Sequence, residues 1–225
     1  MILVFDTETT GKADFGLPAN HPSQPRCVQL AVLLFDDTRQ LRASGNFIIQ
    51  PDGWTISPSA GAIHGITMED AKRYGVPIKT ALSLFSNLAR KTRILSAFNT
   101  DFDRLILASE FYRIGYDPEP IMPTERLVCT MKAMTSVCRL PGSRGGYKWP
   151  KLEEAHRHLF QTWIENAHDA LADTQAAARV LFWLLDNDPT LKQKFGDKPP
   201  GVPDIPGEQK QKHEEPTQPD TTGGS

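Results

Sequence analysis

The chain has 225 residues and a formal net charge of −2, with 39% hydrophobic and 23% charged residues. A chain of this length can bury one sizeable core, because domains typically span roughly 100–200 residues. The slightly acidic balance excludes broad electrostatic attraction to a polyanion, so any contact with nucleic acid is expected to be local. No segment approaches the ~18 consecutive apolar residues of a membrane span. The N-terminus has neither a basic leader nor a small-residue cleavage site, and we therefore expect a soluble, cytoplasmic protein without membrane contact.

The predicted elements alternate between strands and helices. Uniformly apolar or alternating runs predict strands at Met1–Phe5, Cys27–Asp36, Asn46–Gln50 and Arg93–Ala97. Apolar residues at helical spacing predict helices at Pro77–Arg90, Phe102–Ile114, Lys151–Phe160 and His168–Leu185, the last with an N-cap at Asp169 and an end before Pro189. This order is typical of an α/β fold.

The composition changes at Gly196. From there to Ser225 the sequence holds six prolines, few apolar residues and no periodicity, which predicts a disordered tail. The folded domain is therefore expected to cover residues 1–195 and the tail residues 196–225. Two interpretations stay open for the tail: it tethers a partner, or it is a solvated terminus without function.

The three cysteines, Cys27, Cys129 and Cys138, form neither an even set nor a CxxC pair. This pattern argues against both a disulfide framework and a structural zinc site. Free, buried thiols are expected.

The first acidic motif, Asp6-Thr7-Glu8, directly follows the first predicted strand. The period of two in extended chain places Asp6 and Glu8 on one face and Thr7 on the other. Two converging carboxylates repel each other unless they are protonated or bridged by a cation, and their oxygens suit Mg²⁺ or Mn²⁺. Taken alone, the motif fits two solvated charges at a strand end equally well.

The second motif, Phe98–Asp103, lies where a strand passes into a helix, the part of an α/β fold where ligands usually bind. It contains two candidate carboxylates. Asp101 could act as the helix N-cap, whereas Asp103 would fall in the first turn, with Phe102 and Leu105 turned toward the core. We favour Asp103 as the functional residue.

The third motif is His168-Asp169-Ala170-Leu171-Ala172-Asp173. Its small residues allow a helix to lie close against a sheet and leave Asp173 projecting near the start of that helix. His168 precedes this turn, and the ordinary histidine pKa of about 6.5 would allow it to take a proton from water at neutral pH. A capping or core role for His168 is the alternative.

Together, VFDTETTG, the IHGIT element at Ile63–Thr67, AFNTDFD and HDALADT resemble the DEDDh (DnaQ-like) 3′→5′ exonucleases, the group that includes the proofreading epsilon subunit of bacterial replicative polymerase. The resemblance extends from Met1 to Leu185. It implies a ribonuclease-H-like fold, a mixed five-stranded sheet flanked by helices. One departure is Phe98, where many relatives have histidine.

Matched residue by residue, the resemblance implies a complete catalytic set. Asp6, Glu8, Asp103 and Asp173 would bind two divalent cations, Mg²⁺ or Mn²⁺, and His168 would be the general base. The reaction would release nucleoside 5′-monophosphates from the 3′ end of a strand, with DNA favoured over RNA. A polymerase or other replication partner is a candidate ligand of the tail. The resemblance also places four residues near the strand end: Thr9, His64, Asn99 and Phe102; for His64 a capping role, and for Phe102 a core role, stay open.

Two further segments stand apart from these motifs. A Gly-rich loop interleaves basic and aromatic residues, a mixture that could hold phosphates and stack on bases: Arg139, Arg144, Tyr147, Lys148 and Trp149. We favour the alternative that Trp149, next to Pro150, is a packed loop anchor. The other segment is the extra sequence between Gly11 and Arg26, for which no role is predicted.

Three other functions compete with the DNA exonuclease. FDTET superficially matches the Asp-x-Asp-x-Thr of haloacid-dehalogenase phosphatases, but Glu8 argues against that chemistry, which also leaves His168 and Asp173 unexplained. A catalytically silent scaffold of a polymerase complex is disfavoured because all five chemical residues are present. An exoribonuclease remains open, since no ribose-reading element is identifiable.

Overall fold

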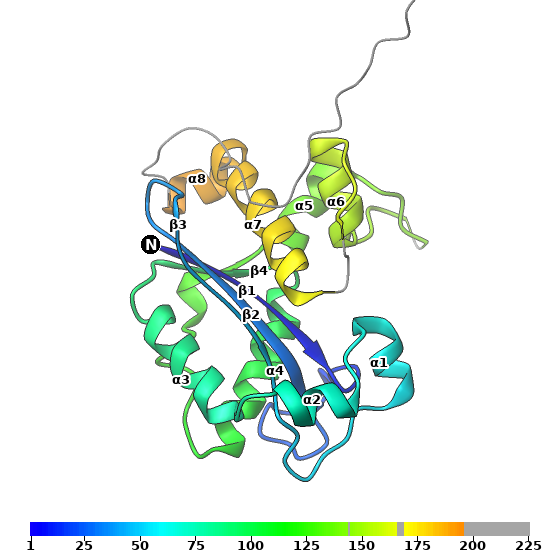
Figure 1. The fold of residues 1–225 in the computed structure, drawn as a ribbon. Helices are drawn as coiled ribbons and strands as arrows, with labels where there is room; N and C mark the ends of the chain where they lie inside the picture. Colours follow the sequence, from blue (N-terminus) through cyan, green and yellow to red (C-terminus); the bar gives the residue numbers. More distant parts are fainter. Residues whose placement is uncertain (144, 166–168, 196–225) are drawn as a thin grey trace, which may run out of the picture.

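The computed structural model describes residues 1–143, 145–165 and 169–195 (Figure 1). The strands are β1 (Ile2–Thr9), β2 (Cys27–Phe35), β3 (Leu41–Ile48), β4 (Ile94–Ala97) and β5 (Leu127–Cys129). The helices are α1 (Pro58–His64), α2 (Met68–Tyr74), α3 (Ile78–Ala89), α4 (Thr100–Arg113), α5 (Thr130–Cys138), α6 (Leu152–Phe160), α7 (Ala170–Asn187) and α8 (Pro189–Phe195), with a 3₁₀ turn at Thr124–Arg126. Within these residues, no helix has the length and apolar character needed to cross a membrane.

The five strands form one mixed sheet in the order β3-β2-β1-β4-β5. β1 pairs antiparallel with β2 and parallel with β4. On the outer sides, β2 pairs antiparallel with β3, and β4 pairs parallel with β5. The central position of β1 explains its uniformly apolar start, since Ile2–Phe5 are buried on both faces. The predicted mixed five-stranded sheet and its flanking helices are confirmed.

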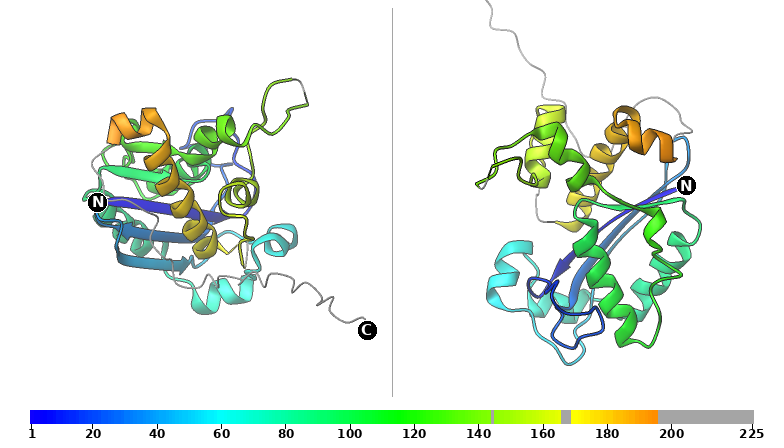
Figure 2. Two further views of the ribbon diagram at one scale, coloured as in Figure 1. Left: turned by 90° about the horizontal axis from the view of Figure 1, so that it is seen from above. Right: turned by 180° about the vertical axis from the view of Figure 1, so that it is seen from behind.

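Successive side chains of β1 point alternately into two hydrophobic cores, one on each face of the sheet. Ile2 and Val4 belong to a cluster with residues of α5, α6 and α7, whereas Leu3 and Phe5 belong to a cluster with residues of α3 and α4. The two groups of helices cover opposite faces of the sheet (Figures 1 and 2). Because side chains of a strand alternate between faces, Asp6 and Glu8 continue toward α7, and Thr7 continues toward α4.

Three predicted element positions are wrong. The first strand runs to Thr9 rather than ending at Phe5, so the first acidic motif lies within it. The third strand covers Leu41–Ile48 rather than Asn46–Gln50, because it is a partly exposed edge strand whose polar residues hide the apolar alternation. The fourth helix begins at Thr100, two residues before the predicted start, and its N-cap is Asn99, not Asp101.

The buried stripe of α4 also differs from the prediction. Leu105 is only half-buried, whereas Ile106 and Leu107 are fully buried. The stripe includes two buried carboxylates, Asp103 and Glu110, so apolar periodicity alone gives the wrong phase for this helix. The cysteine prediction is confirmed with one adjustment, since all three thiols are free but Cys129 is half-buried.

Candidate active site

Asp6 and Glu8 are positioned by the end of β1. Both side chains project from the face that α7 covers, and both are half-buried. The pairing of β1 with β2 shifts register between Glu8 and Thr9, which marks a bulge where the strand leaves the sheet. Bulges often occur beside active sites because they redirect a side chain.

Asp173 comes from the first turn of α7. Asp169 caps this helix, since its Oδ1 accepts hydrogen bonds from the backbone N–H groups of Leu171 at 3.0 Å and Ala172 at 3.1 Å, which confirms the predicted N-cap. The buried residues Ala170 and Ala177 have small side chains that allow α7 to lie close against the sheet. The helix N-terminus, with its partial positive charge, therefore holds Asp173 over β1.

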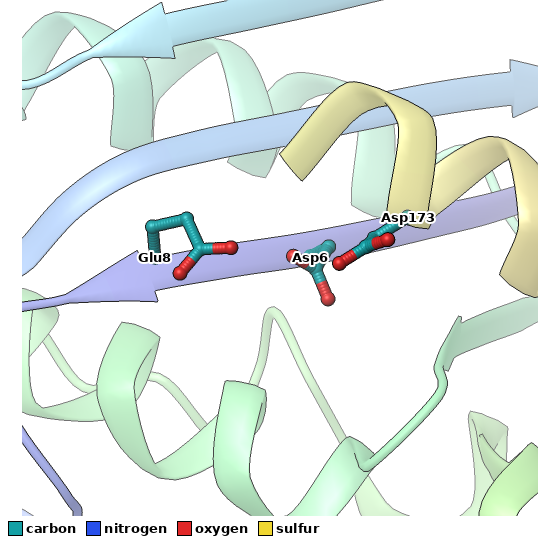
Figure 3. Close-up of side chains that lie close together, drawn as sticks. All are labelled: Asp6, Glu8 and Asp173. Atoms are coloured by element: carbon teal, nitrogen blue, oxygen red, sulfur yellow. The ribbon is translucent and has the colours of Figure 1, made fainter. Parts of the chain in front are cut away.

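The three carboxylates of Asp6, Glu8 and Asp173 form one cluster. Each offers an oxygen, and these oxygens all lie within 4.8 Å of one another. Figure 3 shows the Asp6 and Asp173 carboxylates facing each other, with the Glu8 carboxylate turned toward Asp6. An all-oxygen set of this kind fits Mg²⁺ or Mn²⁺.

The electrostatics of the cluster also favour a bound cation. Burial raises the pKa of Asp6 well above its ordinary value, and the charges of Asp103, Asp173 and Glu8 raise it further. Burial and the charge of Asp173 likewise raise the pKa of Glu8 to about 8. Carboxylates this close resist simultaneous ionisation unless a positive charge compensates them. The donor set therefore fits a divalent metal centre.

Asp103 approaches β1 from the opposite face of the sheet. It is buried on α4, and its Oδ1 accepts hydrogen bonds from the backbone N–H of Thr7 at 2.9 Å and from the Thr7 hydroxyl at 2.8 Å. Burial raises the pKa of Asp103 to about 7, although the two bonds from Thr7 oppose this shift. Asp103 lies outside the set of mutually close oxygens but near enough for its charge to act on Asp6.

Asp101, the other acid of this motif, faces solvent and pairs with Lys132 at 2.5 Å. The structure thus separates the two aspartates that the sequence left as alternatives. Asp103 is buried beside β1, and Asp101 is on the exposed side of α4.

A pocket of about 400 Å³ opens beside Glu8. Three residues predicted to lie near the strand end, Thr9, His64 and Phe102, line it, whereas Asn99 occupies the N-cap of α4 and is not part of its lining. Thr10, Gly11 and Ile63, which also line it, lie in the VFDTETTG and IHGIT motifs, whereas the sequence did not single out the remaining lining residues: Lys12, Ser59 and Ala60. Lys12 lies just after β1, and Ser59 and Ala60 belong to the start of α1, whose last two residues begin the IHGIT element.

His64 ends α1 in a buried position. Its Nδ1 accepts a hydrogen bond from the backbone N–H of Ile66 at 3.1 Å. Burial lowers the pKa of His64, and the backbone of Thr9 lies near enough to oppose this shift in part. Among the described residues, the buried Nε2 nevertheless has no hydrogen bond of ordinary geometry. His64 therefore lies at the wall of the pocket and is not a helix cap, because the caps around it are Ser57 and Gly65 for α1 and Thr67 for α2.

The remaining predictions have mixed outcomes. His168 and the tail from Gly196 to Ser225 lie outside the described residues. The interpretation of Trp149 as a packed anchor is wrong, because its side chain is exposed and the adjacent Pro150 is buried instead. The segment between Gly11 and Arg26 is attached to α4 by its last residue, since Arg26 pairs with Glu110 at 2.9 Å.

A comparison of the sequence with protein families identifies the chain. A family model described as an exonuclease of the RNase T type matches residues 3–181. The chain belongs to this exonuclease family. The match spans the carboxylate cluster, and with the fold it confirms the resemblance to the DEDDh, DnaQ-like exonucleases. Among curated proteins, none matches the sequence of this exonuclease domain.

Solved structures support the same fold. Exonuclease I of E. coli in complex with a dT13 oligonucleotide aligns with a TM-score of 0.69 and 22% identity, covering 85% of this chain and 42% of that chain. The zinc-bound form of the E. coli enzyme with single-stranded DNA gives a TM-score of 0.67 at 23% identity, and an ExoI/SSB-Ct complex gives 0.65 at 20%, with the same coverage. The exonuclease domain thus spans less than half the length of these structures.

Proposed function

We propose that this protein is a metal-dependent 3′→5′ exonuclease that hydrolyses single-stranded DNA from its 3′ end. The carboxylate cluster of Asp6, Glu8 and Asp173 carries the proposal, because the fold brings one residue from α7 to two residues at the end of β1. Structures of E. coli exonuclease I with dT13 and dA16 oligonucleotides support single-stranded DNA as the substrate class.

The acidic residues would hold two divalent cations. Asp6, Glu8 and Asp173 fit one site directly, and Asp103 lies beside them with one oxygen already bonded to Thr7. When bound, such ions stabilise the charge that develops on the attacking and leaving oxygens of a phosphodiester. The negative charge of the site is thereby compensated locally, which explains how a slightly acidic protein acts on a polyanion.

The chain's own residues would orient the strand end and move one proton. The pocket beside Glu8 accommodates the terminal nucleoside between Phe102, His64 and Thr9. We assign the role of general base to His168 on the sequence motif, so that it takes a proton from the attacking water. A bond forms between the water oxygen and phosphorus, the bond to the 3′ oxygen of the penultimate nucleotide breaks, and a nucleoside 5′-monophosphate leaves.

The proposal is tested with 5′-labelled single-stranded DNA and RNA oligonucleotides incubated with the protein in Mg²⁺, Mn²⁺ or EDTA. We expect a ladder that shortens from the 3′ end of DNA in either metal and disappears in EDTA. Preferential shortening of RNA would reassign the substrate. No shortening of either strand by folded protein would contradict the exonuclease and favour the silent scaffold.

Matched variants test the roles proposed for Asp6 and Asp103. Asp6→Ala should abolish shortening, and Asp103→Asn should lower the rate by about 10- to 100-fold, as loss of groups that support a metal does. Asp101→Asn is the control, because Asp101 lies on the same helix, two residues away, but is exposed and pairs with exposed Lys132. It should change the rate by about twofold at most. Equal effects of the two asparagine variants would refute the role given to Asp103.

A further inference from the structure

We propose that a rim of exposed aromatic and basic side chains around α6 binds single-stranded DNA on the 5′ side of the terminal nucleotide. The aromatic rim consists of Tyr147, Lys148, Trp149, Arg157 and Trp163. The inference rests on the proposed function and extends it, because it assigns a second contact for the same strand outside the pocket beside Glu8.

The aromatic side chains of the rim are unusually exposed for their size. Tyr147 is 54% exposed, Trp149 62% and Trp163 66%. Large aromatic rings are generally buried, and their exposure in a group marks a binding surface. Trp149 and Trp163 flank α6, since one precedes its N-terminus and the other follows its C-terminus.

The loop that presents Tyr147 and Trp149 is held by its own backbone. Gly142 donates a hydrogen bond to the carbonyl of Gly146, and Lys148 donates one to the carbonyl of Leu140, both at 2.9 Å. Positive φ angles at Gly145 and Gly146, 84° and 70°, allow this turn. Tyr147 and Trp149 are two positions apart and so share one side of an extended segment. The rings are therefore displayed by a defined hairpin, with buried Pro150 as its base.

The charge of this part of the chain suits a polyanion. Between Arg139 and Trp163 the sequence has five Lys and Arg against two Glu, although the whole chain has a net charge of −2. Arg157 stacks over Trp163 at 4.3 Å and has no carboxylate partner among the described residues, while Lys148 pairs with Glu154 at 2.6 Å. A guanidinium on an indole offers its N–H donors to a phosphate while the rings offer stacking faces.

The loop that carries Tyr147 and Trp149 and the elements that line the pocket lie on one side of the molecule. In Figures 1 and 2, the loop before α6 projects to the same side as α1 and the end of β1, which carry the pocket and Glu8. α6 itself packs against α7, the helix that carries Asp173. A strand whose 3′ end occupies the pocket can therefore continue toward the rim.

The chemistry of the rim favours a single strand. α6 has nine residues and is therefore about 13 Å long, with Trp149 before its first residue and Trp163 after its last. Aromatic rings stack on any unpaired base, whereas bases within a duplex hide these faces. The rim thus predicts sequence-tolerant binding that strengthens with strand length.

Fluorescence anisotropy of the full chain with 5′-labelled DNA in Ca²⁺ tests the rim. The probes are a trinucleotide, which fills only the pocket, and a strand of about 15 nucleotides, near the upper site size of single-strand-binding folds. The double variant Trp149→Ala/Trp163→Ala should weaken binding of the long strand about tenfold or more and leave the trinucleotide unchanged. Trp149→Phe/Trp163→Phe, which keeps two stacking rings, should restore most of the affinity.

Tyr116→Ala is the matched control, because Tyr116 is 63% exposed but follows the C-terminal end of α4, the helix whose first turn holds Asp103. It should bind both probes as the wild type does. The proposed role of the rim would be refuted if Trp149→Ala/Trp163→Ala weakened binding of both probes equally. It would also be refuted if the wild type bound duplex more tightly than single strand, or did not bind the long strand. If the protein bound the long strand more tightly than the trinucleotide but did not shorten DNA in Mg²⁺, the binding role of the rim would stand and only the proposed hydrolysis would be refuted.

Discussion

The hydroxyl and the backbone N–H of Thr7 both donate hydrogen bonds to Oδ1 of Asp103, at 2.8 and 2.9 Å. Thr7 lies between Asp6 and Glu8 in the strand but projects from the other face of the sheet. One short stretch of β1 therefore supplies two acids to the carboxylate cluster and two donors that orient a buried acid of α4. The position of Asp103 depends on the same residues that position the cluster.

The first prediction concerns this contact. Thr7→Val removes the hydroxyl donor with little change in shape and leaves the backbone donor in place. We expect a loss of about 1–2 kcal/mol in the free energy of unfolding, because the buried hydrogen bond from the Thr7 hydroxyl to the Asp103 carboxyl is lost. The exonuclease rate should also fall, since Asp103 loses one of the bonds that fix its orientation. Urea unfolding and a strand-shortening assay measure the two effects.

The control for this variant is Thr38→Val. The Thr38 hydroxyl also donates to an aspartate, Asp36, at 2.6 Å, but this contact is in the exposed turn between β2 and β3. It should change stability by no more than about 0.5 kcal/mol and leave the rate unchanged. If Thr7→Val behaved in the same way, the contact with Asp103 would have no functional weight.

The second prediction is the pH dependence of stability without metal. Folded Glu8 has a pKa of about 8 and folded Asp103 a pKa of about 7, whereas unfolded carboxyls titrate near ~4. Between these values the folded state holds more protons than the unfolded state, so stability falls as pH rises from about 4 to about 8. Thermal unfolding in EDTA should show a melting temperature that decreases across this window.

Mg²⁺ should reverse this trend. A cation compensates the ionised carboxylates, so the stabilisation by metal should grow as pH rises and protons are displaced. Glu8→Gln, which cannot ionise, should flatten the decline in EDTA. A melting temperature that rises from pH 5 to pH 8 in EDTA would contradict the raised pKa values of the cluster.

The central sheet, and the face on which each side chain of β1 lies, could be predicted from the sequence because both follow from periodicity. Periodicity reports which side of an element is buried, and in β1 it places Asp6 and Glu8 on one face and Thr7 on the other. It did not predict the phase of α4, because buried Asp103 and Glu110 occupy positions where periodicity looks for apolar residues.

The pocket beside Glu8 was only partly predictable for a different reason. Its lining combines the end of β1, α1 and the first turn of α4. Lys12 and Ser59 stand out in no local pattern, and they approach Glu8 only through the fold. The short helix α1 was missed as well, although Ser57 caps it through a bond from the backbone N–H of Ala60.

The third prediction concerns buried Glu110. It accepts hydrogen bonds from Arg26 at 2.9 Å, from Arg113 at 3.1 Å and from the backbone N–H of Cys27 at 3.0 Å. Glu110→Ala leaves two guanidinium groups and a buried N–H without this partner. We expect a loss of about 3–5 kcal/mol in the free energy of unfolding, measured by chemical denaturation.

Glu119→Ala provides the comparison, because Glu119 also pairs with an arginine, Arg104, at 2.6 Å, but is exposed. An exposed pair contributes about 0–1 kcal/mol. Similar losses in the two variants would show that the buried network at the start of β2 does not anchor the segment between Gly11 and Arg26.

The fourth prediction places the boundary of the folded domain. Helix α8 packs Leu191 and Phe195 against the core beneath α7, and Arg93 donates a hydrogen bond to the carbonyl of Phe195. Deletion of residues 196–225 should therefore leave stability and strand shortening unchanged within about 0.5 kcal/mol. Deletion of residues 189–225 should cost about 2–3 kcal/mol, because two half-buried apolar side chains are lost. Denaturation curves of the two truncated chains locate the boundary. Equal stability of the two chains would move the end of the domain to Asp188. A large loss of stability on removing residues 196–225 alone would make that segment part of the fold.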